Sequence, residues 1–397
     1  MSIDIMAEAE ALLPKVTELR RRIHANPELG NQLPETTQAA LDSLAGLDLE
    51  YRYSKDTTGF VATLHGAGNG PRIMLRADMD ALPMPEDNDL PFASKNAGRM
   101  HACGHDSHTA MLSGAAHLLS AHRDAINGSI DFFFQTGEEG HFGARVAIDE
   151  GLFEAPNAPD AVFAIHITPQ IPVGTVNCKP GPLLAAADTW ELEIVGKGGH
   201  ASMPHDCLDP IPVACDIVSA YNTFVTRRIN AFDPVVLTTT KIEAGTTSNV
   251  IPESARLMGT LRSTSPRARA LAHEGLERIA HSIAAAHEME ARFSLNEGYP
   301  VTINDPDFAE FARKVAIKLL GEQGFIPMRA PMMGAEDFSY FLQRWPGVMM
   351  FLGVKPDDPT LAAPCHSNRM MLNEAGMAHG VALHAQIALD WLSGQTA

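Results

Sequence analysis

The sequence predicts an α/β protein that is interrupted by a second module of mixed helices and strands. Apolar runs typical of buried strands alternate with helical periodicity up to residue 184 and again from residue 297. Between them, residues 189–295 follow the order strand, helix, strand, strand, helix, strand, which is the ferredoxin-like motif. A chain of 397 residues also suits two domains. We therefore expect residues 1–184 and 297–397 to form one discontinuous domain and residues 185–296 to form an inserted one.

The composition argues against several classes of partner. A formal net charge of −18 disfavours nucleic acid and anionic membranes. No stretch approaches the roughly 18 uncharged apolar residues of a membrane span, and the start of the chain lacks the basic and apolar regions of a signal peptide. The five cysteines are scattered and do not resemble a disulfide framework. We expect a cytoplasmic protein.

The first segment is expected to begin with an amphipathic helix over residues 3–26. Further helical spacing and three strand-like runs follow, at 36–46, 51–53, 60–64 and 72–77. The last of these strands leads into Asp78 and Asp80. Carboxylates at the carboxyl end of a strand in an α/β sheet lie where such sheets bind ligands, although a solvated turn fits these residues equally well.

The nine residues Met100–His108 contain three histidines, a cysteine and an aspartate. Cys103 and His105 flank Gly104, which lets the backbone bend so that both side chains can face one cation. Thiolate and imidazole ligands suit a divalent metal such as zinc. Small and apolar residues at helical spacing follow, so the ligands would lie at the N-terminus of a buried helix. The alternative is a surface loop that is merely rich in histidine.

Two further apolar strands also end in groups that can bind metal or carry protons. The strand over 129–135 leads into Glu138 and Glu139, and the strand over 161–166 ends in His166. Adjacent glutamates point in different directions, so one can bind a metal ion while its neighbour handles protons. Each group alone would be ordinary, as a charged loop or a core histidine. Three consecutive strands that end in this way favour a metal site.

The remaining elements complete the two domains. In the insert we expect strands at 189–195, 235–242, 255–262 and 291–295, and helices at 210–228 and 266–287. After the insert the α/β pattern returns, with a helix at 308–320, a strand at 348–354 and a final helix at 373–392. His366 stands in a loop before that last helix.

Five motifs occur in a specific order along the chain, at Arg76–Pro83, Met100–His108, Gln135–Glu139, Gly196–His205 and Asn249–Pro252. With them the sequence closely resembles the metal-dependent aminoacylase/carboxypeptidase family over nearly its whole length. Within that family it is similar to the amidohydrolase branch of hippurate, N-acyl-amino-acid and auxin-conjugate (IAA-amino-acid) hydrolases. The resemblance implies a metallopeptidase-like α/β catalytic domain and a ferredoxin-like lid that also forms a homodimer contact, with a dimer of dimers as a further arrangement.

The resemblance also implies roles for individual residues. Two divalent metal ions per subunit, zinc before manganese, cobalt or nickel, would be held by Cys103, His105, Glu139, His166 and His366, with Cys103 as the bridge. Glu138 would be the general base, and Asp80 a carboxylate associated with the metal site. On the lid, His200 would complete the active site of the partner subunit. Asn249 and Arg262 would hold the substrate carboxylate, and His205 is a further candidate for substrate binding.

The sequence departs from the family pattern in two places. Thr136-Gly137 replaces the usual Pro-Ala, and Ser107 replaces a glycine. Because neither change removes a ligand or the base, they concern the shape of the pocket.

The predicted function is metal-dependent hydrolysis of linear amide C–N bonds in N-acyl amino acids, yielding a carboxylic acid and a free amino acid. A dipeptidase or carboxypeptidase on the same scaffold is the alternative within the enzymes. Cys103 counts against it, since peptidase branches carry aspartate there. A non-catalytic protein that binds acylated amino acids is the alternative outside them, and the presence of Glu138 and all five ligands counts against that.

Overall fold

The computed structural model describes residues 4–394, and contacts divide them into two compact units. The first unit comprises the chain up to Gly181, Ile303–Arg329 and the chain from Tyr340 onward. The second comprises Pro182–Thr302 and Ala330–Ser339. The sequence places residues 330–339 in the catalytic domain instead. They group with the second unit because the backbone N–H of Ala185 donates to the carbonyls of Met332 and Gly334, at 3.0 and 2.9 Å.

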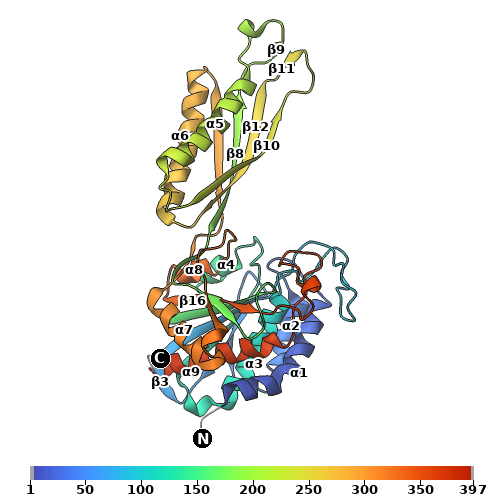
Figure 1. Ribbon diagram of the computed structural model, residues 1–397, viewed down its shortest axis with the longest axis vertical. Helices are drawn as coiled ribbons and strands as arrows, with labels where there is room; N and C mark the ends of the chain where they lie inside the picture. The colour runs from blue at the N-terminus through green and yellow to red at the C-terminus, as the bar shows by residue number, and fades with distance from the viewer. Residues whose placement is uncertain (1–3, 395–397) are drawn as a thin grey trace. The chain divides into compact units, whose positions relative to one another are not determined.

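An eight-stranded sheet forms the centre of the first unit (Figure 1). Its order is β1-β2-β4-β3-β5-β16-β6-β15. The four central strands β4, β3, β5 and β16 run parallel to one another. The strand bounds are β1 Glu50–Tyr53, β2 Phe60–His65, β3 Gly68–Asp78, β4 Asn127–Gln135, β5 Ala161–Thr168, β6 Val176–Cys178, β15 Phe325–Pro327 and β16 Gly347–Gly353. Parallel strands place their carboxyl ends at one edge, which is where the site is built.

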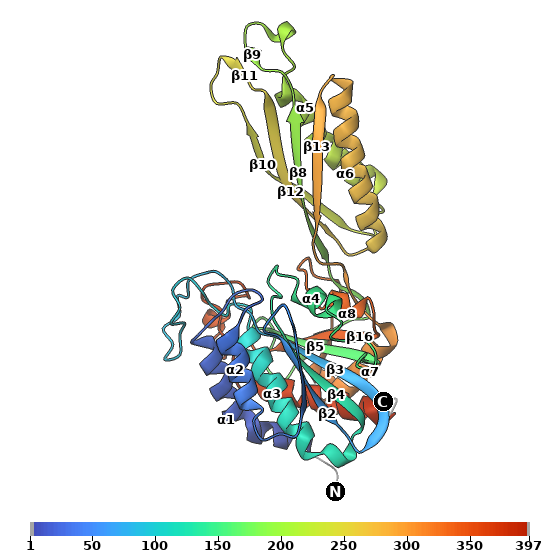
Figure 2. The ribbon, with the colours of Figure 1, turned by 180° about the vertical axis from the view of Figure 1, so that it is seen from behind.

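Helices cover this sheet, and Figure 2 shows α1, α2 and α3 side by side. Helix α3 lies between α1 and α9 and is almost entirely buried. Its small residues allow that close packing: a Cβ on Gly114 would lie 2.7 Å from both Val16 and Val381. The helices of this part of the chain are α1 Ile5–His24, α2 Pro34–Ser43, α3 His105–Ala121, α4 Gly143–Asp149, α7 Pro306–Leu320, α8 Ser339–Leu342 and α9 Gly376–Leu392.

The second unit is a four-stranded antiparallel sheet with two helices on one face. The strand order β10-β12-β8-β13 is the arrangement expected of the ferredoxin-like motif. Trp190 and Tyr221 stack edge to face in its core. The main elements are β8 Ala186–Val195, α5 Pro210–Arg228, β10 Val235–Ala244, β12 Ser254–Ser263, α6 Pro266–Ala286 and β13 Glu290–Glu297. Strands β9 (Gly199–His200) and β11 (Val250–Ile251) form a separate two-stranded ribbon.

The predicted α/β fold with a ferredoxin-like insert is confirmed. Most predicted elements occur within a few residues of their expected bounds, and α5 matches its predicted range at both ends. The last helix begins at Gly376, three residues later than predicted, because the Asn373 side chain accepts a hydrogen bond from Ala375 N and forms a turn there. The prediction omitted the short elements β6, β9, β11, β15 and α4, together with β7 (Gly181–Leu184) and β14 (Thr302–Asn304).

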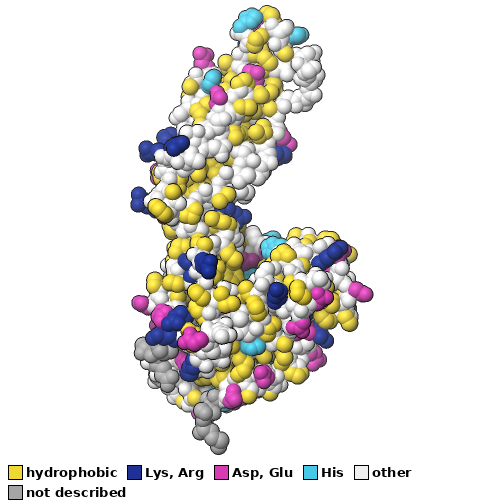
Figure 3. Space-filling model, viewed as in Figure 1, with side chains coloured by type: hydrophobic (Ala, Val, Ile, Leu, Met, Phe, Trp, Pro, Cys, Tyr) yellow, Lys and Arg dark blue, Asp and Glu magenta, His cyan; other side chains and the backbone are white. Residues whose placement is uncertain are grey.

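The surface carries charged side chains of both signs (Figure 3). Figure 3 shows acidic and basic side chains interspersed with hydrophobic ones over the face in view, so charge is not gathered there in one patch. Among residues 4–394, no helix combines the length and the apolar character needed to cross a bilayer.

Candidate metal centre

The site forms where three parallel neighbouring strands end. Asp78 is the last residue of β3, Glu138 and Glu139 follow the end of β4, and His166 lies near the end of β5. Strands β4, β3 and β5 are adjacent in that order, so these side chains meet at one edge of the sheet. The structure therefore brings together the three strand ends that the sequence singles out.

A tight loop brings Cys103 and His105 to the same edge. Gly104 caps α3 with a φ of +85°, a left-handed conformation that favours glycine. A Cβ at this position would also lie 2.6 Å from Cγ1 of Ile167. The loop that carries His366 is tied to this one, because His366 N donates to the carbonyl of Ala102 at 2.8 Å.

Donor atoms of the five predicted ligands and of Glu138 form three groups, each with its atoms within 4.8 Å of one another. Cys103, His105 and Glu139 each occur in two of these groups. Cys103 Sγ lies 3.2 Å from His166 Nε2, and His366 Nε2 lies 3.3 Å from Glu139 Oε1. The groups are Cys103/His105/His166, Cys103/Glu139/His366 and His105/Glu138/Glu139.

Several buried atoms at the site have no hydrogen-bond partner within the described part of the chain. They are both ring nitrogens of His105 and Oε1 of Glu139. Charged groups of Asp78, Asp80 and His366 lie 3.6, 3.4 and 3.3 Å from these atoms without forming a hydrogen bond. Burying a polar atom without a partner costs about 1–3 kcal/mol, so such atoms are rare. Imidazole nitrogens and carboxylate oxygens are ligands of divalent transition metals. The residues present therefore fit a divalent cation.

Electrostatics point the same way. Burial lowers the pKa of His105, but Asp78, Asp80 and Glu139 outweigh it and raise that pKa to about 10. The carboxylates thus favour a positive charge at the position of His105. Burial, helped by His108, lowers the pKa of His166 to about 3, so its ring is neutral near pH 7. Its Nδ1–H donates to the Ile167 carbonyl at 2.6 Å, which leaves the Nε2 lone pair facing Cys103.

A second thiol lies beside Cys103. A hydrogen bond with Cys365 and burial both raise the pKa of Cys103 well above its usual range. The same hydrogen bond lowers the pKa of Cys365. A metal ion would reverse this balance, because a coordinating thiol loses its proton.

Asp80 holds the two glutamates in place. Its Oδ1 and Oδ2 accept the backbone N–H groups of Glu138 and Glu139, each at 3.0 Å. Oδ1 also lies 3.4 Å from His105 Nδ1. Asp80 therefore fixes the turn that aims both glutamates, a role more specific than the sequence indicates.

His108 is a site residue that sequence reasoning missed. Its Nδ1–H donates to Asp78 Oδ1 at 2.5 Å, and its Nε2 accepts the Ile167 N–H at 2.9 Å. It thereby joins α3 to the ends of β3 and β5. The available signal was its spacing, since residues three apart on a helix, such as His105 and His108, share one face.

A buried charge network that also went unrecognised supports the first turn of α3. Asp106 Oδ2 accepts hydrogen bonds from Arg20 Nε at 2.7 Å and from His24 Nδ1 at 2.8 Å. His24 Nε2 lies 3.0 Å from Glu86 Oε1. Burial raises the pKa of Asp106, but Arg20 and His24 hold it well below the usual range. The signal in the sequence is the four-residue spacing of Arg20 and His24, which places them on one face of α1.

In the second unit, the β9–β11 ribbon brings His200 and Asn249 together. His200 pairs with Val250, and Ala201 N donates to the Asn249 carbonyl at 3.1 Å. Nδ1 of His200 accepts the Ser202 N–H at 3.1 Å and lies 2.8 Å from the Ser202 hydroxyl. The neutral ring therefore carries its proton on Nε2, which is free to donate.

The other two predicted lid residues lie elsewhere in the second unit. Arg262 lies in β12 opposite Val236 and Ala187, and no described carboxylate forms an ion pair with it. His205 is 68% exposed, and its Nε2 lies 3.8 Å from Asp206 Oδ2. Within residues 4–394 neither residue has a hydrogen bond to His200 or Asn249.

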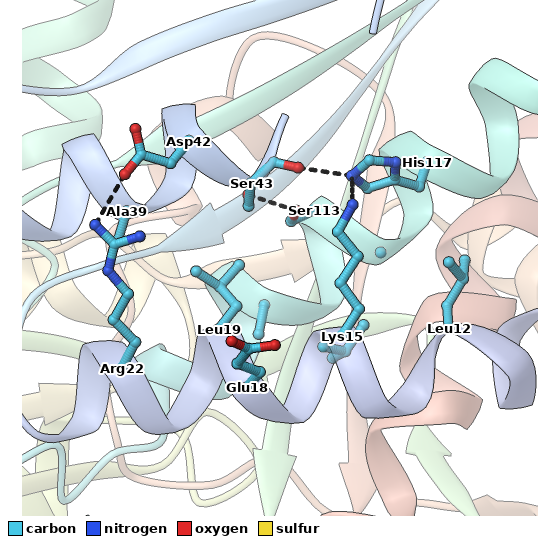
Figure 4. Close-up of a pocket in the computed structure, with 13 residues that line it drawn as sticks. Leu12, Lys15, Glu18, Leu19, Arg22, Ala39, Asp42, Ser43, Ser113 and His117 are labelled. Carbon is cyan, nitrogen blue, oxygen red and sulfur yellow. Dashed lines mark hydrogen bonds and ion pairs between the residues drawn. The ribbon is translucent and has the colours of Figure 1, made fainter. Parts of the chain in front are cut away.

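A cavity of about 160 Å³ lies away from this site, between α1, α2 and α3 (Figure 4). Lys15 Nζ lies 2.9 Å from His117 Nε2, which lies 2.6 Å from the Ser43 carbonyl. The rest of the lining includes apolar residues such as Leu12 and Leu19. It contains none of the predicted site residues.

Known proteins are similar to this chain in sequence and in fold. Residues 74–390 match Peptidase family M20/M25/M40. The chain is 37% identical over 381 residues to Thermostable carboxypeptidase 2 of Saccharolobus solfataricus, covering 95% of each chain. It is also 37% identical over 390 residues to IAA-amino acid hydrolase ILR1-like 2 of Arabidopsis thaliana, covering 97% of this chain and 87% of that protein.

A solved structure supports the same relationship. The Bacillus subtilis YxeP protein, described as a dinuclear metal binding peptidase from the M20 family, superposes with a TM-score of 0.83. It is 34% identical, and the match covers 96% of this chain and 99% of that one. The predicted family resemblance is thus confirmed. This chain belongs to Peptidase family M20/M25/M40, in its amidohydrolase branch, and is a metal-dependent hydrolase of amide bonds.

Proposed function

We propose that this enzyme hydrolyses N-acyl amino acids to a carboxylic acid and a free amino acid. The observation that carries the proposal is the clustering of donor atoms from five candidate metal ligands beside Glu138. Among the described residues, both ring nitrogens of His105 and Oε1 of Glu139 have no hydrogen-bond partner. The similarity to an IAA-amino acid hydrolase along 97% of the chain supports this class of substrate.

Cys103, His105, Glu139, His166 and His366 would hold two divalent ions, zinc being the first expectation. The description of the YxeP protein as dinuclear supports this number. When bound, a divalent metal lowers the pKa of its water toward about 7 and polarises the scissile carbonyl.

The chain supplies the proton transfers. Glu138, buried beside the ligand Glu139, would take a proton from the attacking water and return it to the leaving amine. Asp80 keeps Glu138 in position through the backbone hydrogen bond at 3.0 Å. His108 fixes the end of β5, and so the direction of His166, through Ile167 N.

The second unit would stabilise the transition state. His200, with its proton on Nε2, would donate to the developing oxyanion, an interaction typically worth about 3 kcal/mol. By family resemblance it would serve the partner subunit of a homodimer. Strand β10 supports a dimer contact, because it is an edge strand that exposes Val236 and Ile242.

Arg262 would bind the α-carboxylate of the substrate, together with Asn249. A guanidinium group pairs with a carboxylate through two parallel hydrogen bonds. Arg262 is available for this, since no described carboxylate forms an ion pair with it. By contrast Arg256, on the same strand, lies 2.9 Å from Glu193 Oε1. Substrates with a free carboxylate are therefore favoured.

A carboxypeptidase or dipeptidase activity is the second candidate. It rests on the similarity to Thermostable carboxypeptidase 2, which has the same 37% identity as the IAA-amino acid hydrolase. Both activities place a free carboxylate at the amine side of the scissile bond, so Arg262 suits both. The two activities would differ in the group that they accept on the acyl side of the scissile bond.

A substrate panel tests the proposal. N-acetyl, N-benzoyl and indole-acetyl amino acids, their C-terminal amides and unblocked dipeptides would be assayed with zinc, manganese or cobalt. We expect turnover of the N-acyl amino acids, loss of activity on chelation and recovery with metal. Preferred cleavage of dipeptides would favour the second candidate, and full activity of protein shown to be metal-free would refute both.

Arg262→Ala adds a matched test of the carboxylate site. We expect kcat/KM to fall on the order of 100-fold for free acids, as for loss of one partner of a charge pair, and much less for the amides. Arg256→Ala, which removes an exposed arginine of the same strand, is the control. It should leave kcat/KM unchanged for both the free acids and the amides. Equal losses on acids and amides would remove Arg262 from the substrate site.

A further inference from the structure

Cys365 is a thiol at the metal centre that the proposed mechanism does not use. Its Sγ lies 3.9 Å from the backbone carbonyl oxygen of Cys103, although 262 residues separate the two in sequence. Both are free cysteines. The Cys365 thiol thus lies against the main chain of Cys103, which belongs to a separate loop and is a predicted metal ligand.

A backbone hydrogen bond holds the two loops that carry these cysteines together. The hydrogen bond of 2.8 Å from His366 N to Ala102 O joins the peptide groups that directly adjoin Cys365 and Cys103. A disulfide requires two neighbouring backbones with thiols directed toward each other. Here the two backbones adjoin, and the Cys365 thiol lies within 3.9 Å of the Cys103 main chain.

The other three cysteines lack such a neighbour in the described chain. Cys178 is buried, and its Sγ accepts from Asn304 Nδ2 at 3.4 Å. Cys207 contacts the Met203 carbonyl at 3.5 Å, and Cys215 is exposed on α5. Cys103 and Cys365 are therefore the one pair of cysteines within residues 4–394 that is placed to react together.

We propose that Cys103 and Cys365 form a reversible disulfide when the enzyme is free of metal, which makes the metal centre a site of oxidative modification. The oxidant is a hydroperoxide. Cys365 is partly exposed while Cys103 is only 7% exposed, so Cys365 is the thiol that the oxidant meets first.

The two steps balance. The sulfur of Cys365 attacks the peroxide, and an S–O bond forms as the O–O bond breaks. Water or an alcohol leaves, and Cys365 becomes a sulfenic acid. The sulfur of Cys103 then attacks the sulfenic sulfur, an S–S bond forms as the S–O bond breaks, and a second molecule of water leaves. The thiols lose two electrons and the peroxide gains them. A dithiol reverses the change by exchange.

Oxidation and metal binding would exclude each other. A sulfur in a disulfide has no thiolate charge to offer a metal, and a coordinated thiolate is withdrawn from oxidation. This exclusion rests on the proposed role of Cys103 as a ligand. The disulfide itself requires only that the two thiols are neighbours.

The test treats metal-free full-length protein with hydrogen peroxide. We expect the thiol count after denaturation to fall from five to three. The intact mass should decrease by two hydrogen atoms, and peptide mapping should show Cys103 linked to Cys365. Zinc loaded beforehand should slow the reaction by about 10-fold or more. Zinc binding followed by calorimetry should be lost after oxidation and return with a dithiol.

Two variants sharpen the test. Cys365→Ser should bind zinc as the wild type does but form no link, and Cys215→Ser should behave as the wild type throughout. A link between other cysteines, or oxidation of Cys365 that stops short of a disulfide, would overturn the proposal. If the disulfide forms and zinc still binds fully, the exclusion fails and Cys103 is not a ligand. That result differs from a failed substrate panel, which would refute the proposed function alone.

Discussion

Two neighbouring glutamates have different surroundings at the candidate site. Glu139 Oε1 lies 3.3 Å from His366 Nε2. Burial raises the pKa of Glu139, but His366, His105 and Cys103 together outweigh burial and lower that pKa. Glu138 is 6% exposed, and its backbone is held by Asp80. Glu139 thus contacts the predicted ligand His366, while Glu138 is the residue proposed to carry protons.

Replacing each glutamate with glutamine should separate these roles. Glu138→Gln keeps the shape but removes the base, so we expect normal metal content and a kcat reduced by about 10²–10⁴-fold. Glu139→Gln should weaken metal binding instead. Metal analysis and kcat measured on the same samples would check this. Loss of metal in both variants would show that the assignment of roles is wrong.

At the scale of elements, the turn into α3 depends on one glycine. Gly104 has a φ of +85° and no room for a Cβ beside Ile167. Gly98 has a φ of +75°, and a Cβ added there would have no other atom within 4 Å, so it offers a control for the backbone strain alone.

Gly104→Ala should displace the loop that carries Cys103 and His105 and so reduce metal affinity. The strain of a left-handed alanine costs roughly 1–2 kcal/mol, and the collision with Ile167 adds to it. Gly98→Ala should show the strain without the collision and keep its metal affinity. Zinc titration and thermal unfolding of both variants would check this, and equal metal affinities would contradict it.

A buried carboxylate joins three elements of the second unit. Asp188 of β8 accepts hydrogen bonds from Arg269 and His273 of α6 and from Gly298 N, after β13. Burial raises the pKa of Asp188, but the hydrogen bonds from Arg269 and His273 outweigh it and lower that pKa to about 2. A lowered pKa in the folded state means that the carboxylate stabilises the fold above its unfolded pKa of about 4.

Asp188→Asn should therefore lower the free energy of unfolding on the order of 2 kcal/mol at neutral pH. The difference from wild type should shrink as the pH falls from about 4 toward about 2, because the unfolded state binds a proton at Asp188 over that range while the folded state does so only near pH 2. Urea unfolding at several pH values would measure it. Asp216→Asn, on the exposed side of α5, is the control and should have little effect. If the difference in unfolding free energy between Asp188→Asn and wild type did not depend on pH, the proposed contribution of the Asp188 charge to stability would be wrong.

At the scale of the whole molecule, the predicted chemistry is divided between the two units. All five predicted metal ligands and Glu138 belong to the first unit, whereas His200, Asn249 and Arg262 belong to the second. If His200 serves the partner subunit, each active site needs one intact first unit and one intact second unit from different chains.

Mixing two inactive variants tests this division. His200→Ala should be folded, dimeric and metal-loaded but nearly inactive, and Glu138→Gln should be equally inactive. In their heterodimer one site would have both residues intact, so random exchange should restore about a quarter of the wild-type sites. Activity and subunit exchange would be followed together. Exchange without recovered activity would place His200 in its own chain's site or outside catalysis.

The short elements show the limit of what local pattern determines. The long strands and helices could be predicted because their apolar periodicity extends over many residues. The three-residue strands β6 and β15 carry no such signal, and they form because β16 and β6 offer backbone partners at the sheet edge. Residues 330–339 likewise join the second unit through hydrogen bonds to Ala185 that no local pattern reveals.

The sequence alone determined the α/β class, the ferredoxin-like insert and the chemical groups at the ends of β3, β4 and β5, because these follow from residue type and spacing along the chain. Tertiary structure decided which atoms meet. It placed Asp80 under the Glu138 and Glu139 amides, His108 between Asp78 and Ile167, and the Cys365 thiol beside Cys103. These contacts join residues between 30 and 262 positions apart. They depend on how the loops fold back over the sheet, which cannot be predicted from the spacing of residues along the chain.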